Sequence, residues 1–173
     1  MIYVALLRGI NVGGKNKIDM KQLRVTFENI GMNSVTTYIN SGNIIFSDKT
    51  HTQKKLESLL GKAVHHDFGL EIKVLLLNIN ELSIIINTLP DNWKDDKYMK
   101  CNVLFLWGEI DDKTILNKIA VKHDIDKVVY VPGAVLWAVE QKKVTKSGLM
   151  KLAGTDVYKN MTIRNVNTTR KMF

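Results

Sequence analysis

The sequence contains little cysteine and proline, and it lacks long hydrophobic runs. Its 173 residues include one cysteine and two prolines. Cys101 cannot form an internal disulfide and lies in an apolar run, so we expect a buried thiol in a reducing compartment. The longest apolar runs, such as residues 74–77, fall far short of the roughly 18 residues that cross a bilayer. The run before Arg8 lacks the preceding basic residues of a secretion signal, so we predict a cytoplasmic protein with no membrane partner.

Metal-binding residues are also scarce. The chain has four histidines, and adjacent His65 and His66 would point about 100° apart on a helix, so they could not share one metal ion. A single cysteine excludes a zinc ribbon. The sequence therefore predicts no metal site and indicates no cofactor.

The composition that is present suits a folded basic protein. Hydrophobic residues make up 45% and charged residues 24% of the chain, which is ordinary globular composition. The length fits one domain or two small ones. Twenty-five basic residues against seventeen acidic ones give a net charge of +8. This excess favours a partner that carries phosphates, either a nucleic acid or a phosphorylated small molecule.

The first half has the pattern of a βαββαβ unit. An apolar run at residues 2–7 predicts a strand that is covered on both faces, and Asp19 caps a helix with an apolar stripe that ends at Gly31. Alternating strands at residues 35–39 and 44–46 flank a tight turn. A second helix then ends near Gly69 and is followed by a strand at residues 72–77.

The second half repeats this order. A helix that ends at Pro90 and a polar stretch connect the halves, and the pattern restarts with strands at residues 102–107, 128–131, 135–139 and 161–164. Helices are expected after Asp111 or Asp112 and around Leu149, with a helical stub from Asn167. We therefore predict an α+β fold of two tandem ferredoxin-like halves, residues 1–79 and 101–173, joined by residues 80–100.

The loop from Gly9 to Asn16 matches the spacing of a phosphate-binding P-loop except at its last position. Asn16 stands where that motif requires Ser or Thr to place a hydroxyl on Mg²⁺. Two interpretations are open: backbone N–H groups and Lys15 hold an anion, or the glycines only permit the turn between strand and helix. The RNA-recognition fold is a poor match, because the third strand offers a single aromatic residue and the first strand is apolar on both faces.

Residues 161–171 concentrate hydrogen-bond donors at a strand end and a helix start. Arg164 and Asn165 could hold a phosphate or carboxylate there, while Asn167 could be a helix cap. Ser41 and Ser147 have no histidine near them in the sequence to act as a base. No catalytic residue is therefore assigned.

Three segments closely resemble the bacterial family called domain of unknown function 1697. They are Ala5-Leu6-Leu7-Arg8-Gly9-Ile10-Asn11-Val12-Gly13-Gly14-Lys15-Asn16-Lys17, Tyr38-Ile39-Asn40-Ser41-Gly42-Asn43-Ile44-Ile45-Phe46, and Thr162-Ile163-Arg164-Asn165 with Asn167-Thr168. The resemblance implies a small α+β protein of two ferredoxin-like halves. It supplies no activity, substrate or catalytic residue.

The signature residues are mostly polar or glycine and lie at strand ends and turns, where function tends to reside. We expect them to converge on one anionic, phosphate-bearing ligand such as a nucleic acid or nucleotide. The predicted ligand-binding residues are Arg8, Asn11, Gly13, Gly14, Lys15, Asn40, Ser41, Asn43, Arg164 and Asn165. The alternatives are an enzyme that acts on a phosphorylated small molecule, with Arg8 and Lys15 stabilising charge, and a non-catalytic interaction module. The sequence leaves open whether the protein is an enzyme.

Overall fold

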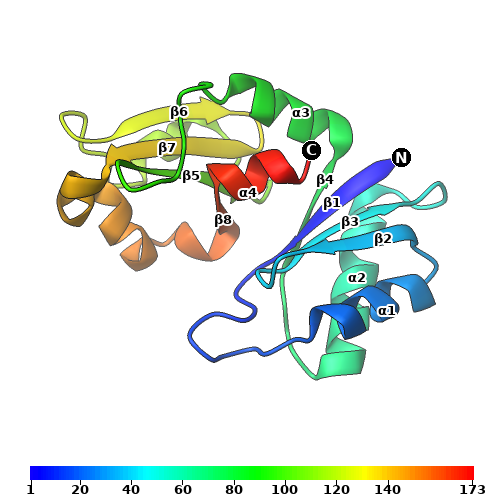
Figure 1. Cartoon of the computed structure of the whole chain (residues 1–173). Helices are drawn as coiled ribbons and strands as arrows, with labels where there is room; N and C mark the ends of the chain where they lie inside the picture. The colour runs from blue at the N-terminus through cyan, green and yellow to red at the C-terminus, as the bar shows by residue number, and fades with distance from the viewer. The chain divides into compact units, whose positions relative to one another are not determined.

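The computed structural model describes all residues, 1–173, and divides into two compact units. Unit 1 comprises Met1–Leu82 with Met172, and unit 2 comprises Ser83–Lys171 with Phe173. Each unit contains one four-stranded antiparallel sheet (Figure 1). The fold is therefore α+β, as predicted. None of its helices combines the length and apolar character that crossing a membrane requires.

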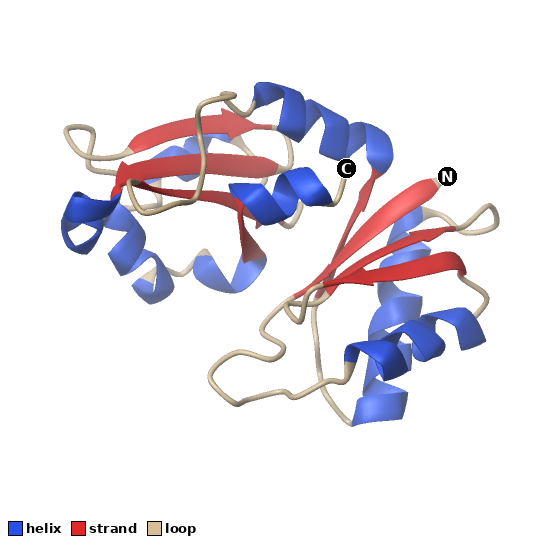
Figure 2. Ribbon diagram, in the orientation of Figure 1, coloured by secondary structure: helices blue, strands red, loops and turns tan.

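Unit 1 contains the elements β1 to β4 with two helices between them (Figures 1 and 2). Their order is β1 (Ile2–Leu7), α1 (Met20–Asn29), β2 (Asn33–Tyr38), β3 (Asn43–Ser47), α2 (Gln53–Phe68) and β4 (Val74–Asn78). The strand order in the sheet is β2-β3-β1-β4. Helix α3 (Ile79–Thr88) follows β4 directly and continues into unit 2.

The alternation of β1 places its side chains on two faces, and both are buried. Tyr3, Ala5 and Leu7 lie in the core with residues of α1 and α2. Val4 and Leu6, on the other face, have no exposed surface. From Tyr3 to Leu7 the strand is buried on both faces, as its apolar sequence predicts, and only Ile2 at its start is exposed.

The aromatic side chains of β1 and β3 contribute to this helix-side core. The rings of Tyr3 and Phe46 stack with centroids 5.7 Å apart, and Phe27 of α1 meets Phe46 edge-on at 5.8 Å. Rings that pack under helices cannot stack on bases. This placement excludes RNA binding in the manner of the RNA-recognition fold, because that fold stacks bases on aromatic side chains of an exposed sheet face.

Helix α1 begins at its predicted cap, and α2 ends at its predicted glycine. The Asp19 carboxylate accepts hydrogen bonds from the backbone N–H groups of Lys21 and Gln22 at 2.8 and 2.9 Å and so caps α1. Thr52 caps α2, which ends at Gly69 in the left-handed conformation.

After the end of α3, unit 2 contains the remaining strands, helix α4 and four short 3₁₀ helices. Their order is β5 (Met99–Leu106), η1 (Lys113–Asn117), β6 (Lys127–Val131), β7 (Ala134–Glu140), η2 (Gln141–Lys146), η3 (Gly148–Gly154), η4 (Tyr158–Asn160), β8 (Met161–Asn165) and α4 (Val166–Lys171). The strand order β6-β7-β5-β8 repeats that of unit 1, position by position.

The helices expected after Asp111 or Asp112 and around Leu149 are 3₁₀ helices rather than α-helices. Asp112 does cap the first of them, through the N–H of Thr114. Within η1 only Ile115 is buried, and in η3 only Gly148 and Leu152 are. One or two buried side chains cannot stabilise an α-helical nucleus, so the chain forms single tight turns.

A buried carboxylate joins two of the loops of unit 2. Asp126 accepts hydrogen bonds from the Ser147 hydroxyl and from the N–H groups of Lys122 and Gly148. Burial alone would raise the pKa of Asp126, but these hydrogen bonds outweigh it and hold the pKa below its ordinary value. Ser147 therefore has a structural partner and serves as a cap for η3.

Candidate functional site

The glycine-rich loop between β1 and α1 is a small hairpin. The backbone N–H of Asn11 donates to the carbonyl of Asn16 at 3.1 Å, and the N–H of Lys15 donates to the carbonyl of Val12 at 3.0 Å. Gly13 and Gly14 form the turn with φ of 58° and 76°, the left-handed values of a type I′ turn. The two glycines are therefore required by the backbone of this turn.

Two asparagine side chains fix this loop to its surroundings. Asn11 donates to the carbonyls of Ile18 and Asn40 at 2.9 and 2.8 Å, and its Oδ1 accepts from the N–H of Ile18 at 2.8 Å. Asn16 donates to the carbonyl of Gly9 at 2.9 Å. Both asparagines have positive φ, 53° and 48°, which asparagine tolerates better than most residues. The loop is thus held by side-chain hydrogen bonds at both ends.

The turn between β2 and β3 lies against this loop. Asn11 bonds to the Asn40 carbonyl, and the N–H of Leu7 donates to Gly42 at 2.8 Å. Asn43 is fully buried and donates to the Tyr38 carbonyl and the Ser41 hydroxyl at 3.0 and 2.9 Å. A Cβ at Gly42 would approach Ile10 within 2.8 Å. The turn residues of the signature therefore form one connected structure with the loop.

Basic side chains accompany this end of the sheet. Residues 1–18 contain Arg8, Lys15 and Lys17 and no acidic residue. Lys15 and Lys17 are exposed, whereas Arg8 is half-buried. The N–H of Arg8 donates to the carbonyl of Lys73 at 3.0 Å, which brings the start of β4 to the same end. We call this surface, formed by Arg8, Lys15 and Lys17 with the turn at residues 40–43, the loop end of unit 1.

The loop end does not have the geometry of a P-loop. Helix α1 begins at Met20, five residues after Lys15, rather than wrapping directly around the lysine. The carboxylate of Asp19 already occupies the N–H groups at the start of that helix. An anion that binds here must therefore contact lysine side chains and loop amides, not the helix terminus.

Of the ten predicted site residues, the structure brings eight together. Arg8, Asn11, Gly13, Gly14, Lys15, Asn40, Ser41 and Asn43 all belong to the loop end of unit 1. Arg164 and Asn165 belong to β8 in unit 2. That all ten residues hold one ligand stays a prediction.

Arg164 and Asn165 have structural hydrogen bonds within unit 2. Arg164 is only 8% exposed and donates to the Thr162 hydroxyl and the Ile163 carbonyl at 3.0 and 2.8 Å. Burial lowers the pKa of Arg164 to about 10, so the guanidinium still carries its charge at neutral pH. Asn165 accepts from the N–H of Thr168 at 2.7 Å and caps α4.

Other donors of the C-terminal stretch also fix the fold. Asn167 exchanges two hydrogen bonds with the backbone of Asp95 at 3.2 and 2.8 Å. Arg170 donates to the carbonyls of Trp93 and Pro90. These contacts attach α4 to the segment before β5. Capping and attachment therefore account for much of the donor concentration that the sequence shows here.

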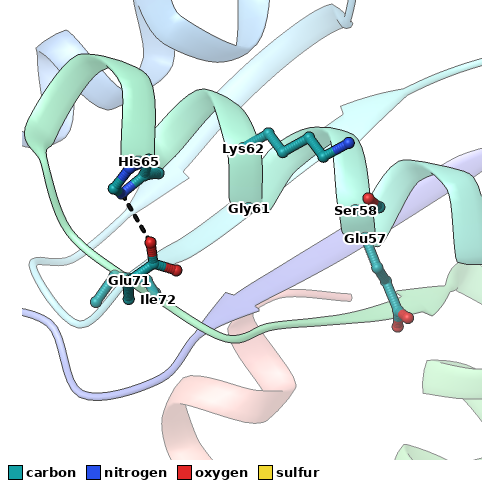
Figure 3. A pocket seen from close by; sticks show the side chains of 7 residues that line it. All are labelled: Glu57, Ser58, Gly61, Lys62, His65, Glu71 and Ile72. Atoms are coloured by element: carbon teal, nitrogen blue, oxygen red, sulfur yellow. Dashed lines mark ion pairs between the residues drawn. The ribbon is translucent and has the colours of Figure 1, made fainter.

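A groove that the sequence did not indicate runs along α2 in unit 1 (Figure 3). Its volume is about 300 Å³, and it is lined by Glu57, Ser58, Gly61, Lys62, His65, Glu71 and Ile72. His65 Nδ1 lies 3.0 Å from the carboxylate of Glu71, which comes from the segment after the helix. No group of three or more His, Cys, Asp or Glu side chains is placed to hold a metal ion.

Gly61 is the sequence signal that could have drawn attention to this groove. It lies in the middle of α2, where glycine is less favourable than alanine by up to about 1 kcal/mol. A Cβ there would meet only the carbonyl oxygen of Ile72, at 3.8 Å. Neither packing nor backbone conformation requires a glycine at this position.

Comparisons with known proteins give a structural likeness and no curated relative. A search of curated proteins finds no match. A conserved bacterial protein from Streptococcus pneumoniae, SP0830, is similar in structure, with a TM-score of 0.84 and 29% identity over 99% of this chain and 96% of that one. The small subunit of acetolactate synthase from Thermotoga maritima aligns over 95% of this chain and 92% of that one at 16% identity, but its TM-score of 0.26 carries no inference.

The sequence profile of one protein family matches most of the chain. That family is described as "protein of unknown function (DUF1697)", and the match covers residues 1–137, which include the glycine-rich loop and the β2–β3 turn. The chain belongs to the DUF1697 family, as the resemblance of its signature segments predicts.

Proposed function

We propose that the loop end of unit 1 binds a phosphate-bearing ligand. The observation that carries the proposal is that the loop and the turn form one connected structure. Hydrogen bonds of Asn11 join the loop to the turn. The same loop contains exposed Lys15 and Lys17, and Arg8 precedes it. A surface that is fixed before binding loses little conformational entropy when it binds. Lysine ammonium groups contact phosphate as point charges.

The charge of this surface favours an anion over other small ligands. Its three basic residues have no acidic residue within the first eighteen positions. Lys15 and Lys17 make no ion pair, so their charges are available to a ligand. The ligand is either a nucleic-acid backbone or a nucleotide, which share the phosphate group.

Binding of labelled oligonucleotides across a salt series tests this proposal. We expect saturable binding of a single strand or a duplex, with log K falling linearly as log salt rises. The double variant Lys15→Gln/Lys17→Gln should bind more weakly and lower the slope by about 0.7 to 0.9 for each contact that is lost. The same titration with ATP as competitor separates a nucleotide from a nucleic acid.

The matched control is Lys54→Gln/Lys55→Gln, which removes the same charge from exposed positions on α2. Equal losses in both variants would indicate that net charge alone drives binding. An unchanged affinity in the loop variant would reject the proposal. A lower melting temperature of the loop variant with unchanged affinity would favour the non-catalytic interaction module, in which the signature only fixes the turns.

We further propose that the chain is a duplication of a ferredoxin-like unit. Support comes from the sheets, because β2-β3-β1-β4 and β6-β7-β5-β8 have the same order and only antiparallel neighbours. The split βαββαβ unit has two helices between its strands. Unit 1 has both as α-helices, and unit 2 has 3₁₀ helices in the corresponding places.

A further inference from the structure

Nearly all of the net charge lies in the last fifth of the chain. Residues 141–173 contain eight basic residues and one acidic residue, a net charge of +7. Residues 1–140 contain seventeen basic and sixteen acidic residues, a net charge of +1. The charged part begins after β7 and spans η2, η3, η4, β8 and α4, drawn from amber to red in Figure 1.

Four of these eight cations are already engaged by the fold. Arg164 is buried, and Arg170 donates to two backbone carbonyls. Lys142 and Lys143 both pair with Glu140, at 3.1 and 2.8 Å. These four side chains already have partners within unit 2. They are therefore left out of the binding surface.

Three further lysines form what we call the lysine surface. Lys146 ends η2, Lys151 lies in η3 and Lys159 lies in η4. All three are exposed and none makes an ion pair. The only acidic residue between positions 141 and 160 is Asp156. Helix η3 contacts both η2 and η4, so the three lysines lie on neighbouring elements of unit 2.

We propose that the lysine surface binds the phosphate backbone of double-stranded nucleic acid. Lysine side chains that neutralise phosphates release condensed counterions, which drives binding without reading the sequence. Single-stranded binding usually adds aromatic side chains on which bases stack. Tyr158 is the only aromatic residue between positions 141 and 160, and it is half-buried. The surface therefore supplies backbone contacts and lacks a stacking platform.

An anionic membrane is disfavoured by the apolar content of this segment. Between positions 141 and 160, Met150, 60% exposed, is the only large exposed hydrophobic side chain. Surface-bound helices bury a continuous apolar face in the membrane, and 3₁₀ turns of three to seven residues provide none. The proposal concerns unit 2 alone and does not depend on the loop end of unit 1.

The test compares duplex binding of two triple variants of the full chain. Lys146→Gln/Lys151→Gln/Lys159→Gln removes the lysine surface, and Lys49→Gln/Lys54→Gln/Lys55→Gln removes the same charge from exposed positions of unit 1. The probe is a labelled DNA duplex of mixed sequence in a salt series, repeated with duplex RNA. We expect the lysine-surface variant to lower the slope of log K against log salt by close to three, about 0.9 per contact. The control should keep its slope.

Several results would overturn the proposal. They are no duplex binding by the natural chain, equal slopes in the two triple variants, or binding to phosphatidylserine vesicles in preference to duplex. The variant Lys15→Gln/Lys17→Gln separates the two binding surfaces. If it loses duplex binding while the lysine-surface variant keeps it, the loop end binds nucleic acid and the lysine surface does not. The opposite result supports the lysine surface and rejects nucleic-acid binding by the loop end, which leaves the nucleotide as its ligand.

Discussion

Gly148 lies where a side chain has no room. A Cβ at this position would stand 1.6 Å from the carbonyl oxygen of Ala120, and the N–H of Gly148 donates to the buried carboxylate of Asp126 at 3.0 Å. The backbone would have to move to admit even a methyl group. Such a move would disturb the hydrogen bonds that join the two loops of unit 2.

We predict that Gly148→Ala lowers the free energy of unfolding by about 3 kcal/mol or more, because overpacking and a broken buried hydrogen bond combine. Urea unfolding at neutral pH measures the change. The matched control is Gly154→Ala, where no atom lies within 4 Å of the added Cβ and φ is not positive. That substitution should stay within about 0.5 kcal/mol of the natural chain. A mild effect at Gly148 would contradict the close approach of Ala120.

Asn11 makes three hydrogen bonds with its side chain while its backbone has a positive φ. We predict that Asn11→Ala destabilises unit 1 by about 2 kcal/mol, from lost hydrogen bonds and from strain at φ of 53°. Asn11→Gly removes the same hydrogen bonds without the strain and should cost less. Thermal unfolding of the two variants separates the contributions. Equal losses would show that the hydrogen bonds alone matter.

At the scale of the element, α2 contains a glycine that its packing does not need. Leu56, Leu60, Ala63 and Val64 form the buried face of the helix, and Gly61 lies beside the groove in Figure 3. Alanine has room at this position, since the nearest atom to an added Cβ is 3.8 Å away.

We predict that Gly61→Ala raises the free energy of unfolding by about 0.5–1 kcal/mol, because alanine loses less backbone entropy in a helix. Chemical denaturation measures this gain. Ser58→Ala, on the same side of α2, is the comparison. It should raise the free energy of unfolding by about 0.5 kcal/mol at most, because alanine is a better helix former than serine. A loss of stability at Gly61 would mean that the groove is narrower than its geometry indicates.

At the scale of the whole molecule, carboxylates govern the response to acid. Hydrogen bonds hold the pKa of Asp126 below its ordinary value, despite burial, which acts in the opposite direction. Backbone N–H groups and His51 do the same for Asp48. A depressed pKa contributes stability that is present above the unfolded value of 3.8. That stability is lost as the pH falls through the lower folded value.

We therefore predict that the free energy of unfolding falls as the pH drops from about 5 toward 2. Asp126→Asn should flatten this dependence. At neutral pH it should cost about 1–3 kcal/mol, because an amide cannot accept from all three donors. Asp124→Asn is the control, since Asp124 is exposed and makes no hydrogen bond. If both variants kept the acid slope of the natural chain, Asp126 would not be the group responsible.

Periodicity and caps in the sequence predicted most of unit 1. The apolar run of β1 and the cap at Asp19 agree with the structure because each depends on neighbours in the chain. Unit 2 was predicted less well. Strand β5 starts at Met99, three residues before the expected start, because β7 provides Glu140 and Val139 as partners for Met99 and Lys100. A polar residue joins a strand when a distant segment offers it hydrogen bonds.

Part of the candidate site was also predicted from the sequence, and part of it was found only in the structure. Gly13 and Gly14 already indicated a turn in this loop, because glycine adopts a positive φ readily, whereas the positive φ of Asn11 was found only in the structure. The sequence by itself determined the α+β class, the loop and the concentration of lysines after β7. Only the tertiary structure decided that Asn11 joins the loop to the turn at Asn40 and that Arg170 bonds to the carbonyls before β5. Those contacts join residues 29 to 80 positions apart, and no local pattern records such a pairing.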